Sequence, residues 1–239
     1  MATNSETLFT ERRGNLLWVT LNRAAKANAM TVDMMTRAAE AIVQAGKDPD
    51  VTAVLLTGAG DRVFTAGVDV RELPEDGDQK RQRERRSTAL AALQDAVLDT
   101  PRPVVVVLNG SAVGGGAMLA LLADACVAVD ASDLSLPEID LGIATYSGAN
   151  IVAAASSRAV AIDLIQSGRR MPVQEAQALG LVRSVVPRAD LVRRAEEIAL
   201  QLGGKQAAAF ADNKRWMNQA MKVAIAQARE EHARHRARS

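Results

Sequence analysis

The feature that most constrains this chain is residues 103–130, PVVVVLNGSAVGGGAMLALLADACVAVD, where an apolar run leads through a glycine triplet into a second apolar segment. The run from Pro103 to Leu108 has the character of a strand, and residues 117–123 have the length and the alanine and leucine content of a buried helix. A helix that starts directly after glycines exposes unpaired N–H groups at its positive end. The pattern fits either a site for a negatively charged oxygen or close packing of a strand against a helix.

The triplet does not match the common nucleotide-binding motifs. No Gly-Lys-Ser/Thr follows it, so it is not a phosphate loop, and it lacks the G-x-G-x-x-G order of a dinucleotide site. The net charge of +1 and the aromatic content of 3% also argue against a nucleic-acid partner.

Length and composition favour one large domain, or a domain with a C-terminal appendage. The 239 residues are 48% hydrophobic, which is ordinary for a protein with a sizeable core. Residues 1–14 contain no apolar signal core, and no run is apolar for long enough to span a bilayer, so we expect a cytoplasmic protein without a membrane partner. The single cysteine, Cys126, lies in an apolar run and is expected to be a buried, inert thiol.

Hydrophobic periodicity and turn residues predict strands that alternate with helices, which is typical of an α/β protein. Residues 71–86 are dominated by charge and are expected to form a solvated lid or linker. The expected strands are 8–13, 15–21, 51–56, a short run before Gly67, 103–108, 125–129 and 182–186. The expected helices are 32–45 with Thr31 as its cap, 87–98, 117–123, 148–166, 172–179 and a helical region from 188 onward.

Five segments in a fixed order resemble the crotonase superfamily, the enoyl-CoA hydratase/isomerase family. The first of them departs from the family pattern at Ala24, where proline is usual. The segments are LNRAAKANAM (21–30), VFTAGVD (63–69), VLNGSAVGGGA (107–117), LPEIDLGI (136–143) and SGRRMPVQEAQALGLV (167–182).

The resemblance implies an α/β, crotonase-like (ClpP/crotonase) fold of repeated ββα units that form two nearly perpendicular sheets. Residues 1–187 would be the core domain that binds an acyl-CoA thioester, and residues 188–239 a C-terminal helical region that assembles a homotrimer or a hexamer. No metal and no cofactor beyond the coenzyme A moiety of the substrate are expected.

The resemblance also implies roles for individual residues. The backbone N–H groups of Ala66 and Gly115 would hold the thioester oxygen, where charge builds when the acyl group becomes an enolate. For Lys214, which resembles a lysine that can approach the nucleotide, we favour a solvated helix face. The residues implied to line the path of the coenzyme are Lys26, Ala27, Asn28, Ala66, Gly67, Val68, Asp69 and Arg71.

The chain departs from a hydratase at its catalytic positions. Family hydratases carry two glutamates, but Met118 stands at the first position and only Glu138 stands at the second. The usual Pro-Gly-x-Gly is replaced by ATYSGAN (144–150), which makes Tyr146 a candidate. Asp140 is a further candidate, since it would lie on the same side as Glu138 if the segment is extended.

A single carboxylate favours double-bond isomerisation, because Glu138 could remove and redeliver one proton without a second acid or base. The alternatives are a hydratase with an atypical site, a decarboxylase that uses Tyr146, and a non-catalytic acyl-CoA-binding protein. A peptidase-type site is less favoured, because His232 and His235 both lie in the terminal segment.

Overall fold

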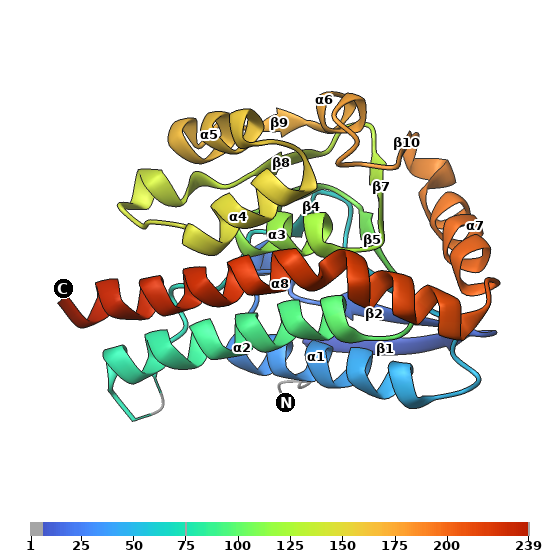
Figure 1. The fold of residues 1–239 in the computed structure, drawn as a ribbon, viewed down its shortest axis with the longest axis horizontal. Coiled ribbons are helices and arrows are strands. Elements are labelled where there is room, and N and C mark those ends of the chain that lie inside the picture. The colour runs from blue at the N-terminus through green and yellow to red at the C-terminus, as the bar shows by residue number, and fades with distance from the viewer. Residues whose placement is uncertain (1–6, 75, 239) are drawn as a thin grey trace.

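The strands of the computed structural model, which describes residues 7–74 and 76–238, form two sheets (Figure 1). Residues 1–6, which belong to the segment predicted to lack a signal core, lie outside the described residues. The larger sheet has the order β1-β2-β3-β5-β7-β10 and is parallel except for the hairpin of β1 with β2. Its strands are Leu8–Arg13, Leu16–Leu21, Ala53–Gly58, Val104–Leu108, Ala125–Val129 and Ser184–Val186. The smaller sheet has the order β4-β6-β8-β9, with strands Val63–Thr65, Ser111–Val113, Asp133–Ser135 and Met171–Pro172.

Three successive units of two strands and a helix connect these sheets. In each unit the first strand joins the larger sheet and the second joins the smaller one. The units are β3-β4-α2 with α2 at Gln79–Asp99, β5-β6-α3 with α3 at Gly115–Leu122, and β7-β8-α4 with α4 at Tyr146–Ala155. The expected repetition of ββα units is therefore confirmed.

Both faces of the central strands β5 and β7 of the larger sheet are buried, as their apolar residues require. Val104, Val106 and Leu108 of β5 face the cluster that contains helix α1 (Val32–Lys47). The alternate residues of β5 face helix α7 (Leu191–Gly203) on the opposite side. The first part of the C-terminal helical region thus belongs to the core of the chain.

Several element boundaries follow the sequence pattern. The hairpin of β1 and β2 is confirmed, and the Thr31 hydroxyl caps α1 by accepting a hydrogen bond from the Met34 N–H at 3.2 Å. Strand β6 was not expected, since the sequence pattern placed a turn directly before the glycines. The remaining short elements are the 3-10 helices η1 (Ala24–Lys26), η2 (Pro137–Leu141) and η3 (Arg188–Asp190), and helix α6 (Val173–Ala178), which Pro172 precedes rather than begins.

Two predictions about helices are corrected. Helix α2 begins at Gln79, where the Asp78 carboxylate caps it by accepting a hydrogen bond from the Arg81 N–H at 3.0 Å. The predicted linker 71–86 can therefore comprise only the residues that precede Gln79. The predicted helix 148–166 is two helices, α4 and α5 (Arg158–Ser167). The helix is interrupted between them, where the Ser157 hydroxyl caps α5 by accepting a hydrogen bond from the Val160 N–H at 3.2 Å.

Helix α8 (Ala207–Arg238) runs antiparallel to α2 and lies between α2 and α4 in Figure 1. Among residues 7–74 and 76–238, no helix is both long and apolar enough to cross a membrane. Along α8 the side chain of Asn218 donates to the Leu98 carbonyl at 3.2 Å, and that of Asn150 donates to the Ala224 carbonyl at 2.7 Å. These bonds fix the helix to both neighbours.

Lys214 anchors the start of α8, and its predicted place on a solvated face is wrong. The residue is 2% exposed, and its ammonium group contacts Asp124 at 2.6 Å and the Arg102 carbonyl at 3.1 Å. Burial raises the pKa of Asp124 and lowers that of Lys214, while the attraction between the two charges opposes both shifts. Asp124 also accepts the Val104 N–H at 2.8 Å, so the pair joins α8 to the start of β5.

We expect Lys214→Met to reduce the free energy of unfolding by about 3 kcal/mol, because it leaves the buried Asp124 without its partner. The matched control is Lys222→Met on the same helix, whose partner Asp99 is exposed, and it should cost no more than about 1 kcal/mol. Urea denaturation of the three proteins measures both values. Equal losses in the two variants would contradict the anchoring role.

Candidate active site

The glycine triplet forms the turn between β6 and α3. Gly114 has φ 55° and ψ −120°, a conformation that L residues rarely adopt, and its N–H donates to the Ser135 carbonyl at 2.8 Å. Helix α3 then begins at Gly115, with the first N–H groups of the helix at this end. The expected site at a strand–glycine–helix junction is therefore present, with β6 as its strand.

A second glycine turn lies against the first. Gly67 has φ 88°, and a Cβ atom placed on it would stand 2.9 Å from the Val113 carbonyl oxygen and 3.4 Å from the Gly115 nitrogen. A Cβ on Gly115 would in turn stand 3.5 Å from Val68 Cγ2. The chain segments that carry Val68 and Gly115 therefore touch.

The N–H groups of Val68 and Gly115 have no hydrogen-bond partner within residues 7–74 and 76–238. The N–H of Ala66, by contrast, donates to the Ala27 carbonyl at 2.9 Å. The expected pairing of Ala66 with Gly115 is therefore corrected: the Ala66 N–H is already bonded, and the available N–H groups here are those of Val68 and Gly115. The reason is the left-handed turn at Gly67, after which Asp69 rather than Val68 donates to the Met30 carbonyl, at 2.8 Å.

Glu138 lies on η2 beside the glycine turn. Its Oε1 atom stands 3.1 Å from the position of a Cβ on Gly114, and its Oε2 atom is buried with no hydrogen-bond partner among the described residues. Burial raises the pKa of Glu138, and a backbone hydrogen bond opposes this only in part. A half-buried carboxyl group with a raised pKa and no ion-pair partner among the described residues is suited to exchanging a proton.

A cavity of about 380 Å³ opens in front of Glu138. It lies between α2, α3, α4 and the C-terminal half of α8, and this size suits a small organic group. Its lining residues are Ser87, Thr88, Leu90, Ala91, Gln94, Met118, Glu138, Ile143, Ala144, Thr145, Tyr146, Ser147, Arg229 and His232.

Met118 and Tyr146 both line this cavity, as the sequence pattern predicted. The Met118 sulfur accepts a long hydrogen bond of 3.5 Å from the Gln94 amide, and the residue is 5% exposed. The Tyr146 ring stands edge-on to the ring of His232, with 5.9 Å between their centroids.

Asp140 does not join Glu138 in the cavity. The prediction assumed an extended segment, but residues 137–141 form η2, in which residues two apart point to different sides. Asp140 is exposed, and its Oδ2 atom stands 3.0 Å from the position of a Cβ on Gly168.

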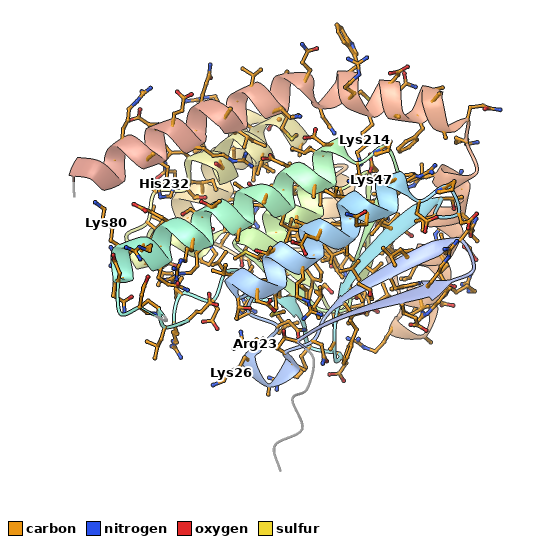
Figure 2. The ribbon with its side chains drawn as sticks, turned by 90° about the horizontal axis from the view of Figure 1, so that it is seen from below. Arg23, Lys26, Lys47, Lys80, Lys214 and His232 are labelled. Carbon is orange, nitrogen blue, oxygen red and sulfur yellow. The ribbon has the colours of Figure 1, made fainter. Side chains whose placement is uncertain are left out.

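The residues implied to line the coenzyme path lie outside the cavity wall. Asn28 is 1% exposed, and its amide donates to the carbonyls of Ala59 and Val63, each at 2.9 Å, so it supports the loop. Asp69 pairs with Arg23 at 2.9 Å, and hydrogen bonds from Arg23 and the Arg71 N–H outweigh burial and hold the pKa of Asp69 below its ordinary value. Figure 2 shows Lys26 beside Arg23, near the first turn of α1.

Lys26 and Arg71 have exposed side chains, so they remain candidates for contact with the negatively charged coenzyme. Ala27, Ala66 and Gly67 lie along the same loops, but their N–H groups already donate to the Ala24 carbonyl, the Ala27 carbonyl and the Thr65 hydroxyl. The coenzyme-binding role of all these residues stays a prediction.

Among the lining residues that were not predicted are the polar side chains of Gln94, Arg229 and His232. Figure 2 shows His232 far along α8 from Lys214, on the same side of the molecule as Lys80 at the start of α2. The signal in the sequence is a stripe on α8 at helical spacing, in which positions 214, 218, 221, 225, 228 and 232 recur every three or four residues. Cys126 is 3% exposed, and burial raises the pKa of its thiol to about 12, which agrees with an inert side chain.

The model of the enoyl-CoA hydratase/isomerase family matches residues 11–237. This chain belongs to the enoyl-CoA hydratase/isomerase family. Carnitinyl-CoA dehydratase of Salmonella enteritidis is 34% identical over 199 residues, which are 83% of this chain and 75% of that protein. An enoyl-CoA hydratase structure from Mycobacterium avium subsp. paratuberculosis has a TM-score of 0.84 at 30% identity, and the match covers 97% of this chain and 92% of that one. A carnitinyl-CoA dehydratase structure from Mycobacterium avium has a TM-score of 0.84 at 26% identity, with 96% and 91% covered. The predicted family and its fold are confirmed.

The raised pKa of Glu138 predicts a stability that depends on pH. A carboxyl group whose pKa is higher in the folded state stabilises the fold at low pH, and this contribution is lost as the pH rises through the folded pKa. Glu138→Gln should therefore be about as stable as the wild type at pH 4 and more stable at pH 8. Thermal unfolding of both proteins at the two pH values tests this, and a variant that is less stable at pH 8 would contradict it.

Proposed function

We propose that this family member is an acyl-CoA double-bond isomerase in which Glu138 is the only acid and base. The observation that supports this most directly is the presence of two groups in one cavity: the half-buried Glu138 carboxyl, whose Oε2 atom has no hydrogen-bond partner among the described residues, and the Met118 thioether. Catalysis is also favoured over simple acyl-CoA binding, because a carboxylate that served no reaction would be expected to face solvent.

In the proposed reaction the thioester oxygen accepts hydrogen bonds from the N–H groups of Val68 and Gly115. The Glu138 carboxylate takes a proton from the α-carbon of a 3-enoyl thioester. The electrons of that C–H bond form the dienolate, whose negative charge lies largely on the thioester oxygen. Protonated Glu138 then delivers the proton to the γ-carbon, the double bond moves to the 2-position, and the carboxylate is regenerated.

Hydration is disfavoured in this site by the chemistry of Met118. A water held at the β-carbon needs two or more hydrogen-bond partners to stay ordered. A thioether is a weak acceptor and donates nothing. The Met118 sulfur already accepts from the Gln94 amide at 3.5 Å, which leaves Glu138 as the carboxylate partner for a water. Hydration or dehydration is the second candidate function, because the relatives named above are hydratases and dehydratases.

The proton-transfer step predicts that the wild-type protein exchanges α-protons of an acyl-CoA with deuterated solvent, or shifts a 3-enoyl bond, faster than it hydrates the 2-enoyl thioester crotonyl-CoA. Glu138→Gln should lower both rates by about 10²-fold or more. Met118→Glu should raise hydration, because the new carboxylate can hold a water and can accept from the Gln94 amide. Mass spectrometry and ultraviolet absorbance measure exchange, isomerisation and hydration.

Asp140→Asn is the matched control for Glu138→Gln, since it removes a carboxylate from the same short helix but outside the cavity. It should leave the exchange rate within about twofold of the wild type. Rapid hydration by the unmodified protein would overturn the isomerase proposal in favour of the second candidate.

We also propose that the chain assembles into a trimer or hexamer through the outer face of α8. Trp216 and Met217 are each 71% exposed, and Val223, one heptad beyond Trp216, is 55% exposed. An apolar stripe of this kind, opposite the face that packs on α2 and α4, is expected to be covered by another surface.

This assembly predicts that Trp216→Asp shifts the protein toward the monomer. Analytical ultracentrifugation at micromolar concentration should find a trimer or larger species for the wild type and a smaller mean mass for the variant. Phe9→Asp on the exposed side of β1 is the control and should leave the mass unchanged, since Phe9 is 43% exposed away from α8. A monomeric wild type would contradict the proposal.

A further inference from the structure

Gln94 places a buried amide in the wall of the cavity. It comes from the inward face of α2 and is 2% exposed. A buried amide presents two donors and one acceptor, and leaving any of them without a partner costs free energy. The contacts of Gln94 therefore decide which of its atoms is available to a ligand.

Arg229 fixes the orientation of this amide. The Arg229 Nη2 atom donates to Gln94 Oε1 at 3.0 Å, and a guanidinium group can only donate hydrogen bonds. The oxygen of the amide must therefore face α8, and its NH₂ group must face the opposite way, toward Met118. Arg229 is itself held by Asp95 at 2.9 Å and by the Ala91 carbonyl at 3.3 Å.

The NH₂ group of Gln94 is poorly satisfied in this orientation. Within the described residues its hydrogen-bond partner is the Met118 sulfur at 3.5 Å, a weak acceptor that can take one of the two N–H donors. The cavity wall thus presents a fixed, under-used donor beside the position where a hydratase carries its first glutamate. A saturated hydrocarbon chain in this cavity would leave the donor unused.

We propose that Gln94 is a specificity-determining residue that binds an acceptor oxygen, a carbonyl or a carboxylate, on the acyl chain of the substrate. Arg229 is a positioning residue, which keeps the amide from turning. The substrate class is thus an oxygenated acyl-CoA rather than a plain alkyl one. This inference builds on the proposed function, since it names the substrate of the same cavity.

Three five-carbon saturated thioesters test the proposal by binding alone, without turnover. Pentanoyl-CoA has a plain alkyl chain, 4-oxopentanoyl-CoA carries a ketone at its fourth carbon, and pentanedioyl-CoA ends in a carboxylate. Isothermal titration calorimetry should find at least one oxygenated ester bound about fivefold or more tightly than pentanoyl-CoA, the scale of one additional hydrogen bond. The ester that binds more tightly shows whether Gln94 binds a ketone oxygen or a carboxylate oxygen.

Gln94→Leu should abolish this preference and leave pentanoyl-CoA bound within about twofold of the wild type. The matched control is Gln82→Leu, which replaces a buried glutamine, 4% exposed, on the same helix outside the cavity and should keep the wild-type preference. Arg229→Met should shrink the preference, because the amide is then free to turn. Circular dichroism verifies that each variant is folded.

Equal binding of all three esters by the wild type would overturn the proposal without reference to any variant. A preference that survives in Gln94→Leu would overturn it as well. Because the esters lack a double bond, a protein that shows the preference but no isomerisation would contradict the proposed function alone.

Discussion

The close approach of two backbone turns is the constraint on which the site depends. Gly67 and Gly114 both have positive φ, and a side chain on Gly67 would collide with the Val113 carbonyl. A Cβ on Gly116 would stand 2.3 Å from Thr65 Cγ2, so the start of α3 also packs closely on the end of β4. Two ββα units meet at this point, and the N–H groups of Val68 and Gly115, which have no partner among the described residues, lie on adjacent segments because the turns have no side chains between them.

The parts of the site that could be predicted from the sequence are those encoded within a few residues. Each of these parts lies in or near a short segment that resembles a family motif. The structure places them around the glycine turn or the cavity: the glycine triplet, Met118, Glu138 and Tyr146. The errors have local causes that the pattern does not reveal. The available N–H group is that of Val68 rather than Ala66, because the φ of Gly67 turns the following peptide. Asp140 lies outside the cavity because its segment is helical rather than extended.

Residues whose role depends on distant partners could not be predicted. Lys214 can be buried because it forms an ion pair with Asp124, which lies 90 positions earlier in the chain. Gln94 and Arg229 are 135 positions apart, so neither suggests a cavity wall by itself. The start of α2 at Gln79 was missed for a related reason. Its first turns are charged, yet Gln82 and Arg86 are buried, and the Arg86 guanidinium donates to the Asp69 carbonyl at 3.4 Å. Local composition describes a solvated segment there, and tertiary contact overrides it.

The position of α8 in the chain has a consequence for biosynthesis. Its hydrogen bonds to Asp124 and to α2 span 90 to 138 residues, so α8 closes long loops of the fold. During translation the two sheets and the glycine turns emerge first, and the cavity lacks the wall formed by Arg229 and His232 until α8 leaves the ribosome. The cavity beside Glu138 is therefore complete only after the last helix of the chain has been made.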